Sequence, residues 1–306
     1  MAAPTFASGS IARSLDWGKL APLRLRARAL AEGIYAGAHK SARRGAGIEF
    51  GGFREYYPGD DLRWLDRRSL LLRDKPLVRQ FETETDRALR LIVDATASMG
   101  YRSKTARGTK YAYSALLAAA LARVAVVGGD PVGLSYIGGS LKGRGRMPVS
   151  SGREAFERVV GSLEAMSPEG DAVVAPKMLD DAIEGIARTA RAGSIVVVLT
   201  DALDLPPEAP VHIGSIASRG RVVVVVQILD PDEATFPFEG TMVLKSLEGN
   251  VRVESDAEVK DRYLQALGNL QSAWKTQLVA RGARWVTGTT DEDPIAVARR
   301  IVTSFR

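Results

Sequence analysis

From residue 88 onward, short runs of Val, Ile and Leu alternate with segments of helical spacing. The runs at 88–94, 194–200 and 221–229 are mostly apolar, at about the length of a single strand. A strand is apolar on both faces when helices cover both sides of its sheet, as right-handed crossovers between parallel strands require. The pattern therefore predicts an α/β fold with an open, doubly wound, mostly parallel sheet.

The same spacing predicts the remaining elements. We expect strands at 131–137, 147–149 and 283–287, a hairpin at 241–254, and helices at 22–35, 110–127, 151 onward, 177–191, 207–219, 256–280 and 294–305. Ser151 and Glu154 have the spacing of a capping box. We divide the chain into a basic N-terminal extension, residues 1–87, and an α/β domain, residues 88–306, with a hairpin insertion at 230–255.

Composition excludes several classes of site. The 306 residues contain 42 Lys and Arg, 36 Asp and Glu, two His and no Cys, for a formal charge of +6. Disulfides, thiolate zinc sites and cysteine nucleophiles are excluded. His39 and His212 are expected to be structural or incidental. The chain has neither a phosphate-binding G-x-x-x-x-G-K-[ST] motif nor the dinucleotide spacing G-x-G-x-x-G.

The N-terminal region accounts for nearly all of the net positive charge. Residues 1–50 hold eight Lys and Arg against three acidic residues. A solvated helix face accounts for this run, and binding of nucleic acid through residues 13–44 is an alternative. The start of the chain lacks a basic segment followed by an apolar one, and Arg123 interrupts the apolar stretch 115–127. We therefore expect a cytoplasmic protein that associates neither with membranes nor, primarily, with nucleic acid.

Polar oxygens follow two of the predicted strands. Asp94, Thr96 and Ser98 come directly after the first strand, and Asp201 follows the strand at 194–200. In doubly wound sheets, ligands bind at the carboxyl ends of the strands. One carboxylate and two hydroxyls form a hard-oxygen donor set suited to Mg²⁺ or Mn²⁺, and Asp201 could accept a hydrogen bond from a water on the metal.

This segment, D-A-T-A-S, resembles the metal-ion-dependent adhesion site of von Willebrand factor A domains, with Thr in place of the first Ser. The resemblance implies that an Asp or Glu of a partner protein completes the metal shell. It also implies a Thr from the loop before the middle helix. Counting back from that helix places Lys177 there, whereas counting forward from Gly170 places Asp171 or Ala172 there. A lysine ammonium would repel a divalent ion and could itself replace the cation between the two acids.

Five short motifs lie upstream of the apolar strands, at 37–41, 45–50, 54–63, 65–66 and 78–84. In order and spacing they resemble the signature of the "domain of unknown function 58" family, over roughly residues 37–137, with Arg67 at a position that is often aromatic. That family joins this block to a von Willebrand factor A-like domain and commonly accompanies MoxR-type AAA+ ATPases. The charged residues of the block are candidates for partner binding: Arg54, Asp60, Asp61, Arg63 and Arg79.

The resemblance implies a non-enzymatic protein-interaction module with a variant metal site, acting as an adaptor for a MoxR-type AAA+ ATPase. No residue is assigned a catalytic role. The alternative from another class is a Mg²⁺-dependent phosphotransferase or phosphatase that uses Asp94 as its nucleophile. Such sites usually need a second carboxylate two residues after the nucleophile, and that position here is Thr96.

Overall fold

The computed structural model describes residues 23–38, 49–55, 76–82, 88–141, 146–238, 243–245, 252–254 and 257–305. The chain divides into two compact units, one formed by residues 1–38 and 87–306 and the other by residues 39–86. The larger unit contains the sheet. It also includes the first helix, which the sequence analysis had assigned to the N-terminal extension.

Six strands form the central sheet of the larger unit, in the spatial order β10-β7-β6-β3-β4-β5. All neighbours pair in parallel except β5, which is antiparallel to β4 at one edge. This confirms the predicted α/β class and the doubly wound, mostly parallel sheet. The strand bounds are β3 Leu89–Ala95, β4 Val132–Gly138, β5 Met147–Ser150, β6 Ile195–Thr200, β7 Val222–Leu229 and β10 Arg284–Thr289.

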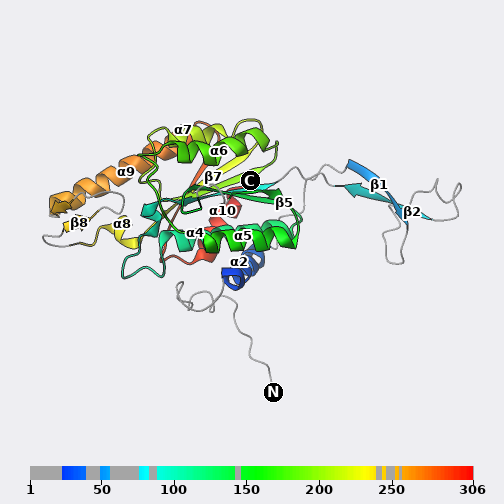
Figure 1. Ribbon diagram of the computed structural model, residues 1–306, viewed down its shortest axis with the longest axis horizontal. Helices are drawn as coiled ribbons and strands as arrows, with labels where there is room; N and C mark the ends of the chain where they lie inside the picture. The colour runs from blue at the N-terminus through cyan, green and yellow to red at the C-terminus, as the bar shows by residue number, and fades with distance from the viewer. Residues whose placement is uncertain are drawn as a thin grey trace, which may run out of the picture. The chain divides into compact units, whose positions relative to one another are not determined.

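Helices cover both faces of this sheet (Figure 1). One face carries α2 Leu23–Ala38, α4 Lys110–Val127, α5 Arg153–Ala165 and α10 Pro294–Thr303. The other face carries α6 Lys177–Thr189, α7 Ala209–Ser215 and α9 Ala257–Val279. Short elements join these parts, namely a 3₁₀ turn η2 at Ala97–Gly100, α8 at Pro231–Thr235, and the antiparallel pair β8 Val243–Lys245 and β9 Arg252–Glu254.

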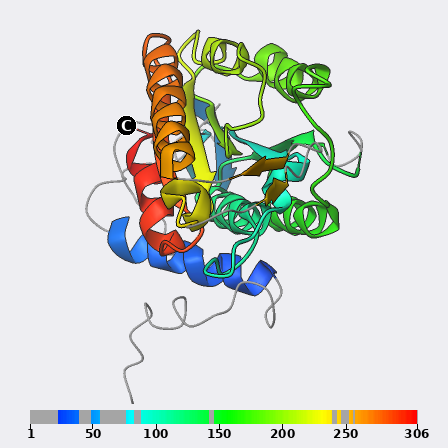
Figure 2. The same ribbon diagram turned by 90° about the vertical axis from the view of Figure 1, so that its left-hand side faces the viewer.

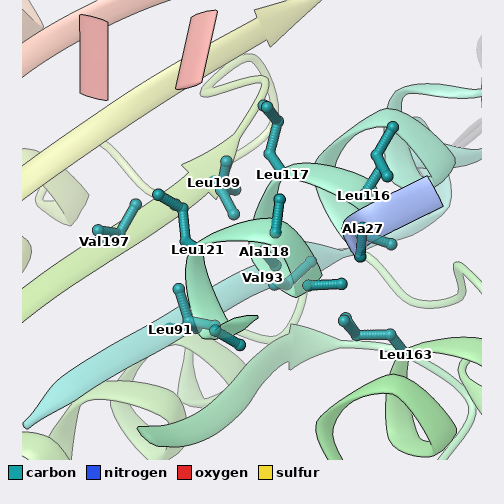
Figure 3. Packing of buried hydrophobic residues seen from close by; sticks show 14 of the residues in the cluster. Ala27, Leu91, Val93, Leu116, Leu117, Ala118, Leu121, Leu163, Val197 and Leu199 are labelled. Carbon is teal, nitrogen blue, oxygen red and sulfur yellow. The ribbon is translucent and has the colours of Figure 1, made fainter. Parts of the chain in front are cut away.

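The core on the α4 side is built from small and branched side chains. Leu117 and Leu121 of α4 lie against Val197 and Leu199 of the sheet, and Leu116 lies towards Ala27 of α2 (Figure 3). Within the described residues α4 is the one helix long and apolar enough to cross a membrane, although it carries two basic residues, and 72% of this stretch is buried inside the protein. This degree of burial is typical of a helix in the core of a folded domain.

The basic helix α2 packs beside α4 and α10 (Figure 2). Its buried residues recur every three or four positions, as an amphipathic helix requires: Leu23, Ala27, Leu30 and Ile34. On its polar side, Arg24 and Arg28 form ion pairs with Glu157 of α5, at 2.6 and 3.5 Å. Part of the predicted basic surface is therefore neutralised within the unit.

Two local predictions differ from the structure. Helix α5 begins at Arg153, and its N-cap is Gly152 at φ 83°, without a side-chain hydrogen bond. The capping box at Ser151 is therefore wrong, because the left-handed glycine separates that hydroxyl from the first turn. Helix α7 spans Ala209–Ser215 and is shorter than predicted, because turns occupy the residues that follow.

The smaller unit contains an antiparallel pair, β1 Glu49–Glu55 and β2 Leu77–Glu82, with a register irregularity between Phe50 and Gly52. Arg54 lies in β1 and Arg79 in β2, where they pair with Val78 and Phe53. The other candidates for partner binding lie outside the described residues, as does His39: Asp60, Asp61 and Arg63.

Candidate functional site at the strand ends

The predicted site residues lie at neighbouring strand ends. Strands β3 and β6 are adjacent and parallel, with Val93 level with Leu199. Asp94 therefore lies beside the end of β6, where Thr200 is followed by Asp201. The chain connections of β3 and β6 run to opposite sides of the sheet, which is the switch point where doubly wound folds bind their ligands.

Asp94 is fully buried, and both of its carboxylate oxygens accept hydrogen bonds. The Thr96 amide and hydroxyl donate to Oδ1 at 2.9 and 2.7 Å, and the Thr200 hydroxyl donates to Oδ2 at 2.6 Å. The Thr96 and Ser98 hydroxyls lie 3.2 Å apart. Three of the four predicted site residues therefore form one oxygen cluster, and Thr200 adds a hydroxyl that sequence reasoning did not select.

The spacing of these oxygens suits a small divalent cation. Six-coordinate Mg²⁺ with ligands at about 2.1 Å holds adjacent oxygens about 3.0 Å apart. The separations of Asp94 Oδ1 from Thr96 Oγ1, and of that atom from Ser98 Oγ, are 2.7 and 3.2 Å. Among the described residues, no three Asp, Glu, His or Cys side chains form a metal-binding group. A metal here would therefore be held by one carboxylate and hydroxyls.

A buried lysine neutralises Asp201. The Lys110 Nζ, at the start of α4, lies 2.7 Å from Asp201 Oδ2 and 2.5 Å from Glu233 Oε1. Lys110 is completely buried, and Asp201 is only 1% exposed. An ammonium does contact Asp201, but it belongs to Lys110, and its second acidic partner is Glu233. Lys177 is exposed at the first residue of α6.

The electrostatics of the cluster follow from burial. Burial and the nearby charge of Asp201 raise the pKa of Asp94 to about 6, against the opposing effect of the bonds from Thr200 and Thr96. Burial works to lower the pKa of Lys110, but the charges of Asp201 and Glu233 outweigh it and raise that pKa. Burial also raises the pKa of Glu233, despite its bond to Lys110. A bound cation would relieve the repulsion between Asp94 and Asp201.

Backbone hydrogen bonds join the loop before α6 to the segment that contains the candidate site. The Gly170 carbonyl accepts a hydrogen bond from the Ala97 amide at 2.9 Å, and the Glu169 amide donates to the Ala95 carbonyl at 2.8 Å. The Asp171 carboxylate accepts hydrogen bonds from the amides of Val173 and Val174, at 2.8 and 3.0 Å. The side chain of Asp171 thus shapes its own turn.

The loop after β7 is tied to the same end of the sheet. Asp230 is buried, accepts a hydrogen bond from the Ser103 amide at 2.9 Å, and caps α8 through a capping box with Glu233. Glu233 in turn contacts Lys110. On the β6 side, Ala202 adopts φ 59°, a left-handed conformation that is costly for a residue with a side chain. Strain and buried charge therefore coincide at this end of the sheet.

Sequence reasoning missed Lys110, Thr200 and Glu233. Lys110 opens a mostly apolar helix, where a cation gains nothing from the adjacent helix dipole, so it needs an acidic partner. Glu233 stands three residues after Asp230, the spacing of a capping box. These signals were present for Lys110 and Glu233, but only the fold brings those two residues together. His212 lies in α7 with half of its side chain exposed, 3.3 Å from Asp180 Oδ1.

A family model described as "Protein of unknown function DUF58" matches residues 52–272. The chain belongs to the DUF58 family. This confirms the family resemblance found in the upstream motifs. An uncharacterized protein of Mycobacterium tuberculosis is 28% identical over 289 residues, which is 94% of this chain and 89% of that protein. One of Mycobacterium avium is 29% identical over 163 residues, covering 53% of this chain and 94% of that protein.

Solved structures are also similar to this chain. The conserved hypothetical protein BatB from Bacteroides thetaiotaomicron is 18% identical, with a TM-score of 0.45, covering 71% of this chain and 98% of BatB. A von Willebrand factor type A protein from Catenulispora acidiphila is 12% identical, with a TM-score of 0.36, covering 74% of this chain and 43% of that one.

Proposed function

We propose that this DUF58 protein is a non-enzymatic protein-interaction module whose strand ends bind Mg²⁺ or Mn²⁺. The observation that carries the proposal is the oxygen cluster of Asp94, Thr96 and Ser98, spaced as the ligands of a small octahedral cation. The ion would supply a positive centre with open positions for a carboxylate of a partner protein. Lys110 neutralises Asp201, so the protein itself offers the ion few charged ligands.

The surroundings of Asp94 favour binding over chemistry. The position two residues later carries a hydroxyl where a phosphotransferase places its second carboxylate.

The proposed partner is a MoxR-type AAA+ ATPase in the cytoplasm, for which this protein acts as an adaptor. The support is the family to which the chain belongs, together with the resemblance of its upstream block to proteins that accompany such ATPases. An acidic side chain of that ATPase would complete the metal shell.

Metal binding is tested by calorimetric titration of the full chain with Mn²⁺ and Mg²⁺. We expect saturable binding that is lost in Asp94→Ala and weakened at least tenfold in Ser98→Ala. Asp181→Asn, an acidic residue exposed on α6, is the matched control and should bind as the wild type does. Equal titrations of Asp94→Ala and Asp181→Asn would contradict the metal site.

Partner binding is tested with a purified MoxR-type ATPase from the same genome. We expect association with the wild type in Mg²⁺, loss of association in EDTA, and loss in Asp94→Ala. Binding that survives both EDTA and the Asp94→Ala change would show that the metal does not bridge the two proteins. Absence of binding in Mg²⁺ by a wild type that still binds the metal would reject this class of partner.

A further inference from the structure

A cavity lies away from the acidic strand ends, beside β3, β4, β5 and α6. Its volume is about 510 Å³, and Arg90, Ser135, Arg146 and Thr189 are among the residues that line it. Arg90 precedes Asp94 by four strand residues, or roughly 13 Å at 3.3 Å per residue. The cavity is therefore separate from the site described above, and nothing in the proposed function uses it.

Among the described residues, the charged side chains that line this cavity are Arg90 and Arg146, and no Asp or Glu is among them. Arg221 is close by: burial lowers the pKa of Arg90, and the charges of Arg221 and Arg146 lower it further. Within the described part of the chain, the buried Nε atoms of Arg90 and Arg221 have no hydrogen-bond partner.

Two of these arginines have a structural role at the end of α6. Arg90 donates to the Thr189 hydroxyl and carbonyl, both at 2.8 Å, and Arg221 donates to the Ala187 carbonyl at 3.1 Å. Such bonds satisfy carbonyls that a helix leaves open at its C-terminus. Helix capping accounts for Arg90 and Arg221, but it does not account for Arg146.

Arg146 is an exposed residue whose guanidinium lies against Gly185 of α6. A Cβ atom added at Gly185 would lie within 1.4 Å of the Arg146 guanidinium, so that guanidinium lies directly against the helix backbone. Glycine in a helix interior is unfavourable relative to alanine. Here it makes room for a cation on the wall of the cavity. The rest of the wall is mainly apolar, from residues such as Leu134 and Ile186.

We propose that this cavity binds a small organic anion. Arg146, with the outer part of the Arg90 guanidinium, holds its phosphate or carboxylate group, and Leu134 and Ile186 contact its apolar body. A planar guanidinium binds either group with two parallel hydrogen bonds. The volume lies within the range of pockets that accept small molecules.

Calorimetric titration of the full chain with phenyl phosphate and with phenylacetate, at one ionic strength, tests this inference. We expect saturable binding of at least one anion, and the tighter of the two identifies the preferred group. Arg146→Gln should weaken that binding at least tenfold. Gly185→Ala should weaken it as well, because the new methyl group displaces the guanidinium without changing the charge.

Arg188→Gln is the matched control for Arg146→Gln. It also removes one positive charge, from an exposed position on α6, the helix that carries Gly185. We expect its affinity to match the wild type. No saturable binding of either anion by the wild type, or equal affinities for Arg146→Gln and Arg188→Gln, would overturn the proposal. Thermal melts of all variants show that each is folded.

Discussion

At the scale of single residues, the most consequential side chain is Lys110. A completely buried ammonium is tolerated only with close counter-charges, and Asp201 and Glu233 provide them at 2.7 and 2.5 Å. The lysine also links the end of β6 to the loop that begins with Asp230. One residue thus holds two strand ends in place and sets the charge of the site.

Replacing Lys110 by methionine should reduce the free energy of unfolding by about 3–5 kcal/mol, because Asp201 would remain buried without its partner. Lys177→Met, the same change at an exposed lysine, should alter it by less than about 0.5 kcal/mol. Urea unfolding of both variants in EDTA measures the difference. Equal effects of the two changes would show that the buried ion pair is not required.

The raised pKa of Asp94 predicts a pH dependence of stability. With a pKa of about 6 in the folded protein against 3.8 ordinarily, Asp94 binds its proton more tightly when folded. Its protonation therefore stabilises the fold at low pH, and this contribution is lost as the pH rises from about 4 to about 6. The size is on the order of 3 kcal/mol.

The measurement is urea unfolding in EDTA between pH 4 and 7, for the wild type and Asp94→Asn. The free energy of unfolding of the wild type should fall with increasing pH relative to that of the variant, because the amide does not titrate. Parallel curves over this range would show that Asp94 is not perturbed in the folded protein.

At the scale of secondary-structure elements, α2 and α4 differ in how much of their surface is buried. Helix α4 is apolar on nearly all sides because α2, α5 and the sheet surround it. Helix α2 buries only one stripe and uses Arg24 and Arg28 to pair with α5. The basic helix is therefore a covering layer of the core.

Leu30→Ala in α2 should reduce the free energy of unfolding by about 2–4 kcal/mol, because that side chain is 2% exposed and its removal leaves a cavity. Leu25→Ala, on the same helix but 55% exposed, is the control and should change it by less than about 0.5 kcal/mol. Chemical denaturation measures both. Similar losses for the two leucines would contradict the packing of α2.

At the scale of the whole molecule, the two units do not coincide with the predicted division at 87 and 88. Residues 1–38 are grouped with the sheet, and residues 39–86 form the second unit. The family block is thus inserted between the covering helix and the first strand of the sheet. Removing the entire N-terminal region would uncover the apolar faces of α4 and α10.

A chain shortened to residues 88–306 should consequently unfold at lower denaturant concentration than the full chain and bind more of a fluorescent apolar dye. A synthetic peptide of residues 20–38 added in excess should reverse part of both changes. A shortened chain as stable as the full one, with no added dye binding, would show that α2 is dispensable.

Periodicity and position were enough to predict the sheet, its helices and the grouping of Asp94, Thr96 and Ser98, because strand burial and short-range spacing are properties of contiguous sequence. The role of Lys110 was not predictable in this way. It depends on Asp201 and Glu233, which lie 91 and 123 residues away and approach it only through the order of the strands. The close approach of Arg146 to Gly185 was not predictable from the sequence either. Long-range charge pairing and close packing are set by topology, and the tertiary structure alone decided them.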